Sequence, residues 1–277
     1  MSFSMVAGGK LHAINGADLT TLHTWPLEDV GSGWHSTSPD LGLALVSGLE
    51  QVRLLEADGA IRWSYRHTPW SGAREAGCTW FDERGRPFAV IPATEKDSCR
   101  IVHLDLMTGR PVAEATLIAE PAGIEPIHQA GGWVGLSEGE GQDAARAWWV
   151  RVANTGDRLQ LIDPGWDDEV LADVDAAGTR IITSPHGGDG PLRIRAFPEL
   201  TVVREVRSPR PDQPWDFVAC FVEPNLVGKL LGGDEPTVAV DPDGRTERLN
   251  VGDGWLVPAA DSWLTVEPTR MQRWILV

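Results

Sequence analysis

Aromatic and acidic side chains recur at corresponding places along this chain, each near the start of a stretch of short apolar runs. Thirteen tryptophans are many for 277 residues. Large rings at such places can stack on a sugar, a heteroaromatic ligand or a partner side chain. They can equally fill the space between neighbouring sheets. The candidate ligand-binding residues are Trp34, His35, Trp80, His128, Trp166, Asp167, Trp215, Asp216 and Trp255.

The carboxylates of the same regions could hold a metal ion, because Ca²⁺ and Mg²⁺ prefer oxygen ligands. These carboxylates are Asp82, Asp167, Asp168, Glu169 and Asp216. No segment has the spacing of an EF-hand loop. Carboxylates at the start of a strand more often accept hydrogen bonds from backbone N–H groups. We therefore assign neither a metal nor a cofactor.

Histidine could supply acid–base chemistry, since imidazole titrates near neutral pH. Of the seven histidines, only His35 and His128 fall on the expected inner strands, where either could act as a general base with a neighbouring carboxylate. None has the spacing of a zinc site. The chain has no G-x-S-x-G elbow, no P-loop and no dinucleotide-binding glycine pattern between a strand and a helix. The catalytic residues therefore stay unknown, and the sequence leans away from an enzyme without excluding one.

The elements that must position these side chains are short strands, arranged in a unit of roughly forty residues that recurs along the chain. Clear copies lie at 43–63 and 88–112, where alternating apolar residues surround turns such as Asp58-Gly59 and Thr108-Gly109. Glycine accepts the positive φ that such hairpin turns need. This pattern predicts an all-β chain that forms a single β-propeller domain over 1–277.

The repeats predict about 26 strands, which fit seven blades of which two are incomplete. Six blades of about 44 residues with extra terminal strands are the alternative. We expect strands from both ends of the chain to close the ring, because closure removes the exposed sheet edges. The units are expected at 34–66, 77–117, 126–162, 167–206 and 215–251, with three further strands in each of 3–25 and 254–277, the last of them at 273–277. Within the unit at 34–66, strands are expected at 43–47 and 51–56.

Two segments resemble the third strand and following turn of the PQQ-like and YVTN/WD40-like β-propeller superfamily: 6–16 and 104–110. In that superfamily the next strand often ends in tryptophan, and Trp25 and Trp63 stand at that place here. The resemblance implies the propeller architecture and identifies no subfamily. The Gly-His and Trp-Asp dipeptides of a standard WD40 blade are not in register in this chain.

Composition narrows the class of partner. The formal net charge of −16 repels phosphate backbones, which argues against nucleic acid and favours a monomer that stays in solution. No run approaches the roughly 18 apolar residues of a membrane helix. The N-terminal residues have no signal-peptide pattern, so a cytoplasmic protein is expected.

Three cysteines without ligand spacing are expected to be reduced and buried: Cys78, Cys99 and Cys220. Few lysines beside abundant Ala, Gly, Arg and Trp suggest a high-GC bacterial genome.

The leading functional hypothesis is a non-catalytic binding or scaffold module, whose acidic, Trp-rich face receives a protein or small ligand. The alternative is a metal-dependent hydrolase or lyase of the propeller-lactonase kind, with Asp167, Asp216, His35 and His128 around a central channel. A third hypothesis is carbohydrate recognition by repeated Trp pockets.

Overall fold

The computed structural model describes the chain at 2–27, 34–70, 77–95, 98–118, 124–139, 145–153, 156, 158–166, 168–186, 190–232, 236–251, 254–259, 262–267 and 270–276. The chain divides into two compact units, which we describe separately. The N-terminal unit comprises 2–140 and 148–163, and the C-terminal unit comprises 141–147 and 164–277. Over the ranges given above, no helix is long and apolar enough to cross a membrane.

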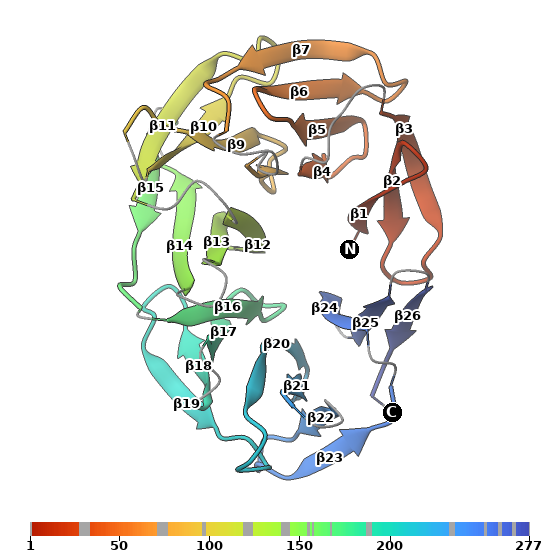
Figure 1. Cartoon of the computed structure of the whole chain (residues 1–277), viewed down its shortest axis with the longest axis vertical. Helices are drawn as coiled ribbons and strands as arrows, with labels where there is room; N and C mark the ends of the chain where they lie inside the picture. The colour runs from red at the N-terminus through yellow and green to blue at the C-terminus, as the bar shows by residue number, and fades with distance from the viewer. Residues whose placement is uncertain are drawn as a thin grey trace. The chain divides into compact units, whose positions relative to one another are not determined.

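The strands form seven antiparallel sheets, the blades of a β-propeller, and within each sheet neighbours in sequence pair with one another (Figure 1). Four blades contain residues of the N-terminal unit. The first has three strands, β1 (Ser2–Ala7), β2 (Lys10–Asn15) and β3 (Thr21–Pro26). The second is β4 (His35–Thr37), β5 (Leu43–Ser47), β6 (Gln51–Glu56) and β7 (Ile61–Arg66). The third is β8 (Thr79–Phe81), β9 (Pro87–Pro92), β10 (Cys99–Leu104) and β11 (Pro111–Leu117). The fourth is β12 (Ile124–Ala130), β13 (Trp133–Gly139), β14 (Ala145–Val152) and β15 (Leu159–Ile162).

Three blades belong to the C-terminal unit. The fifth is β16 (Glu169–Val174), β17 (Arg180–Pro185), β18 (Leu192–Ala196) and β19 (Val202–Val206). The sixth is β20 (Trp215–Val222), β21 (Asn225–Leu230), β22 (Thr237–Val240) and β23 (Thr246–Leu249). The seventh has three strands, β24 (Trp255–Ala259), β25 (Ser262–Glu267) and β26 (Arg270–Trp274).

This architecture confirms the all-β propeller and decides for seven blades instead of six. The described residues form 26 strands, and the two incomplete blades are those built from the ends of the chain. Each end forms its own three-stranded sheet (Figure 1). That the two ends close a ring stays a prediction.

Local sequence accounts for the strands and the turns between them. In β6, burial alternates in step with the apolar residues Val52 and Leu54, as the two-residue period of a strand requires. The turn before β11 needs glycine for two reasons. Gly109 has a φ of +68°, and a Cβ there would lie 2.6 Å from the Trp63 ring of the preceding blade. Trp63 in turn donates its Nε1–H to the Leu106 carbonyl oxygen at 3.0 Å.

Apolar side chains fill the spaces between successive blades of each unit. In the N-terminal unit, Leu45 and Leu54 pack with Ile91 between the second and third blades. In the C-terminal unit, Trp215 packs with residues such as Ile182 and Leu230 between the fifth and sixth blades. All three cysteines are buried, as expected.

Candidate functional site

The aromatic candidates of the N-terminal unit differ in burial. Trp34, directly before β4, is 40% exposed. Trp80 lies in β8, is buried in the core and stacks on Phe88 with ring centroids 5.2 Å apart. Its burial favours the structural interpretation of that ring. His35 is half-buried in β4, and its carbonyl oxygen accepts a hydrogen bond from Ser4 Oγ. His128 lies in β12, but its side chain is outside the described residues.

The aromatic candidates of the C-terminal unit also differ in burial. Trp215 is fully buried, and its Nε1–H donates to the Val206 carbonyl oxygen at 2.9 Å. A side chain at Gly228 would meet the Trp215 ring at 2.9 Å, so this indole fills a space shaped for it. Trp255, the first residue of β24, is 65% exposed. Asp167 lies outside the described residues.

Several predicted carboxylates serve the backbone. Asp82 is buried, and its Oδ1 accepts the N–H groups of Arg84 at 3.0 Å and Arg86 at 2.9 Å. The Arg86 side chain completes this turn by binding the other oxygen of Asp82. Asp216 Oδ1 accepts the N–H of Phe217 at 2.7 Å. These bonds match the expectation that carboxylates at strand ends more often satisfy backbone donors than hold a metal.

Asp168, His186 and Phe217 form a cluster where the fifth and sixth blades begin. His186 Nδ1 lies 2.9 Å from Asp168 Oδ1, and the His186 backbone N–H donates to the Asp168 carbonyl oxygen at 2.9 Å. The imidazole stacks on Phe217 with centroids 5.4 Å apart, and only 9% of the His186 side chain is exposed. Asp168 has a φ of +59°, a left-handed conformation that aspartate tolerates better than most residues. We call these three residues the Asp168–His186–Phe217 cluster.

The bond to Asp168 determines what His186 can offer. In the neutral form of an imidazole, a carboxylate that accepts from Nδ1–H leaves the lone pair on Nε2. Among the described residues, the hydrogen bond of the His186 ring to Asp168 runs through Nδ1. The cluster therefore presents an acceptor nitrogen beside a half-exposed carboxylate and an aromatic ring. Sequence reasoning included Asp168 among the acids and missed His186, because the two residues are 18 positions apart and no motif links them.

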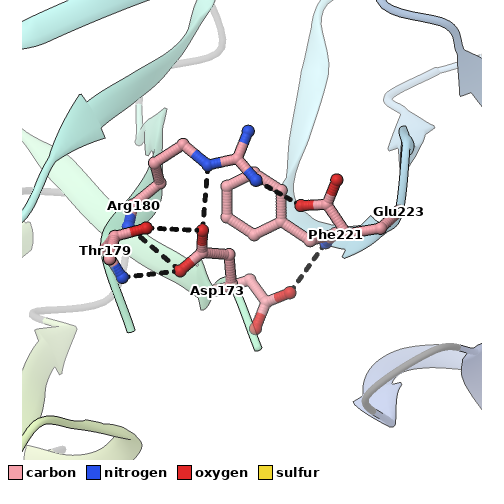
Figure 2. A network of polar contacts seen from close by, with 6 residues as sticks. Asp173, Thr179, Arg180, Phe221 and Glu223 are labelled. Carbon is pink, nitrogen blue, oxygen red and sulfur yellow. Dashed lines mark hydrogen bonds and ion pairs between the residues drawn. The ribbon is translucent and has the colours of Figure 1, made fainter. Parts of the chain in front are cut away.

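A second polar group joins the fifth and sixth blades (Figure 2). Asp173 is 4% exposed and follows a β-bulge in β16. Its two oxygens accept backbone N–H groups at 2.7 Å, Oδ1 from Val174 and Oδ2 from Phe221 of the neighbouring blade. Burial raises the pKa of Asp173 to about 7, although both hydrogen bonds oppose that shift. The carboxyl group of Asp173 thus titrates near neutral pH in a contact between blades.

Arg180 completes this contact from the start of β17. Its guanidinium binds Asp175 at 2.9 Å, pairs with Glu223 and lies over the Phe221 ring at 5.1 Å (Figure 2). Burial alone would raise the pKa of Asp175, but hydrogen bonds from Arg180 and Thr179 outweigh it and lower the pKa. Burial raises the pKa of the neighbouring Cys220 thiol, so this sulfur stays protonated. These groups hold two blades together.

No group of three or more His, Cys, Asp or Glu side chains is placed to hold a metal ion in the ranges that the structure describes. The arrangement instead offers aromatic and carboxylate surfaces at the starts of first strands, with Trp34 in one unit and Trp255 in the other.

Comparison with known proteins supports the fold alone. No family model matches the chain, and no curated protein matches it. Among solved structures, the chain is similar to one described as Kuenenia stuttgartiensis hydrazine synthase. The similarity covers 90% of this chain and 80% of that chain, with a TM-score of 0.51 and 10% sequence identity. A likeness at this identity agrees with the propeller architecture and leaves the activity to be argued from the residues.

Proposed function

We propose that this propeller is a non-catalytic binding or scaffold module that presents an acidic, Trp-bearing surface to a protein or a small ligand. The proposed partner is not a nucleic acid, because a net charge of −16 opposes a phosphate backbone. We place the protein in the cytoplasm as a monomer. Three buried cysteines without the spacing of a disulfide framework fit a reducing compartment.

The observation that carries this proposal is the exposure of Trp255. Its indole is 65% exposed, whereas Trp215, also the first residue of a blade, is fully buried. Trp215 is therefore part of the core, whereas the Trp255 ring is accessible to a binding partner. Tryptophan is among the residues that most often dominate binding energy at interfaces, because it buries a large apolar area with one polar N–H.

The test compares partner capture by wild-type protein and three variants in the presence of EDTA. Trp255→Ala and Trp34→Ala remove the exposed indoles. Met107→Ala is the matched control, since Met107 is a large apolar side chain that is 69% exposed. A captured protein is then purified and its affinity measured by calorimetry. Loss of affinity with either Trp variant but not with Met107→Ala supports the proposal. Equal affinity for all variants contradicts it.

A metal-dependent hydrolase or lyase is the second candidate. It is favoured by the His186 imidazole, which Asp168 orients as carboxylates orient metal-binding or proton-accepting histidines. Asp216 is a predicted ligand that lies in the same unit. A stoichiometric divalent ion in purified protein, lost with Asp216→Ala, would favour this function over the binding module.

A further inference from the structure

Two clusters in the C-terminal unit combine an aromatic ring, a carboxylate and an arginine. In the first, Arg195 lies 4.6 Å from the centre of the Trp166 ring and binds both oxygens of Glu169 at 3.0 Å. In the second, Arg180 lies over Phe221 and binds Asp175. The guanidinium suits such places because it is planar, stacks on rings and offers several N–H donors to carboxylates.

The Asp168–His186–Phe217 cluster has the ring and the carboxylate but no arginine. Within the described ranges, Asp168 is hydrogen-bonded to His186 and forms no ion pair with an Arg or Lys, and no Arg or Lys lies over Phe217. About half of the Asp168 side chain is exposed, and Phe217 is half-buried. The His186 side chain is nine-tenths buried and bonds to Asp168 through Nδ1, so that in the neutral form of the ring Nε2 can accept a hydrogen bond. A cation from another molecule would complete the cluster.

We propose that the Asp168–His186–Phe217 cluster binds the guanidinium group of an arginine side chain on a partner protein. The carboxylate of Asp168 accepts one N–H group, His186 Nε2 accepts another, and Phe217 provides an apolar ring beside the bound group. Arginine fits better than lysine because an ammonium is a compact, strongly hydrated charge that does not stack. The net charge of −16 accelerates the encounter with a basic partner.

This inference rests on the proposed binding function and names the chemistry of its partner. The probe is a blocked five-residue peptide with one arginine between glycines, titrated into the whole protein. Binding is followed by calorimetry and by the imidazole NMR signals of His186, assigned with His186→Gln. We expect saturable binding of the arginine peptide and at least about fivefold weaker binding of the lysine peptide. The citrulline peptide, which has the same shape without the charge, is expected not to bind.

Two variants locate the site. Asp168→Asn removes the charge and retains a residue that tolerates a left-handed backbone, so we expect an intact fold and at least about fivefold weaker binding. Asp58→Asn is the matched control: Asp58 is an exposed turn carboxylate that accepts the Ala60 N–H, and its loss should leave affinity unchanged. Phe217→Leu keeps an apolar side chain and removes the ring. Thermal unfolding of each variant verifies that it folds.

Three results would overturn the inference. They are equal binding of the citrulline peptide, unchanged affinity in Asp168→Asn, or binding of Zn²⁺ in place of the peptide with the same shift of the His186 signals. Failure of the binding-module proposal is a separate result, because it is read from partner capture by the Trp255→Ala and Trp34→Ala variants. If the arginine peptide does not bind while capture of a partner protein still depends on Trp255, only the arginine site is refuted.

Discussion

Replacing Asp173 by asparagine should change how the stability of this protein depends on pH. Raising the pKa of a carboxyl group from 3.8 to about 7 corresponds to about 4 kcal/mol, at about 1.4 kcal/mol per pH unit. Because the folded-state pKa is the higher one, the folded state binds the proton more tightly. The resulting stability is fully present below pH 3.8, declines as pH rises, and is lost above about pH 7.

The side chain introduced by Asp173→Asn cannot ionise, so the stability of this variant does not decline with rising pH in this way. The amide has one oxygen, whereas Asp173 accepts two backbone N–H groups, from Val174 and Phe221. One buried donor then loses its acceptor, at a cost of about 1–3 kcal/mol. We therefore expect the variant to be less stable than wild type near pH 5. Between about pH 5 and pH 8 the wild type should lose about 2–3 kcal/mol of unfolding free energy relative to the variant. The difference in stability between the two proteins should therefore disappear or change sign.

The assay is urea unfolding at a series of pH values, followed by tryptophan fluorescence and by circular dichroism to verify a single transition. Asp105→Asn is the control, because Asp105 is an exposed turn carboxylate and its pKa is lowered by hydrogen bonds from Thr108. Its effect should not grow between pH 5 and pH 8. The reasoning is refuted if the free-energy difference between wild type and Asp173→Asn is constant over this range. Nearby charged and titratable groups that could contribute are Asp175, Arg180, Cys220 and Glu223.

Trp215→Ala should cost about 3–5 kcal/mol of unfolding free energy, whereas Trp255→Ala should change it by less than about 0.5 kcal/mol. Urea unfolding measures both changes, and equal costs for the two variants would contradict the burial assigned to these tryptophans. Gly109→Ala should lower the melting temperature more than Gly244→Ala, because both glycines have positive φ but only Gly109 has an indole within reach of a Cβ. Cys220 should resist alkylation in the folded protein and react only after unfolding, since burial raises the pKa of its thiol; rapid modification of native protein would show that the sixth blade opens.

Strand positions were predictable because they depend on neighbours in sequence. The expected strands at 43–47 and 51–56 coincide with β5 and β6, since alternating apolar residues and a turn fix both the period and the ends. The last strand was expected at 273–277, and β26 runs over Arg270–Trp274 instead. Glu267 pairs with Arg270 in the ladder between β25 and β26, so the last strand begins earlier than expected.

The candidate site was less predictable, because burial and side-chain partners depend on contacts that are distant in sequence. Trp215 and Trp255 both begin a blade, yet one is fully buried and the other is mostly exposed. Their surroundings, and not their local patterns, make this difference. Asp173 likewise accepts a backbone N–H from Phe221, 48 residues away in the chain.

The amino-acid sequence by itself determined the all-β class, the propeller repeats and their turns, since these follow from two-residue periodicity and from glycines at positive φ. It left six or seven blades open, and the structure decided for seven. The packing of one blade against the next decided which aromatic rings are buried in the core and that the Asp173 carboxyl group is desolvated. It also brought His186 into contact with Asp168 and Phe217. Those outcomes depend on distance in space and on desolvation, and a linear pattern of residues records neither.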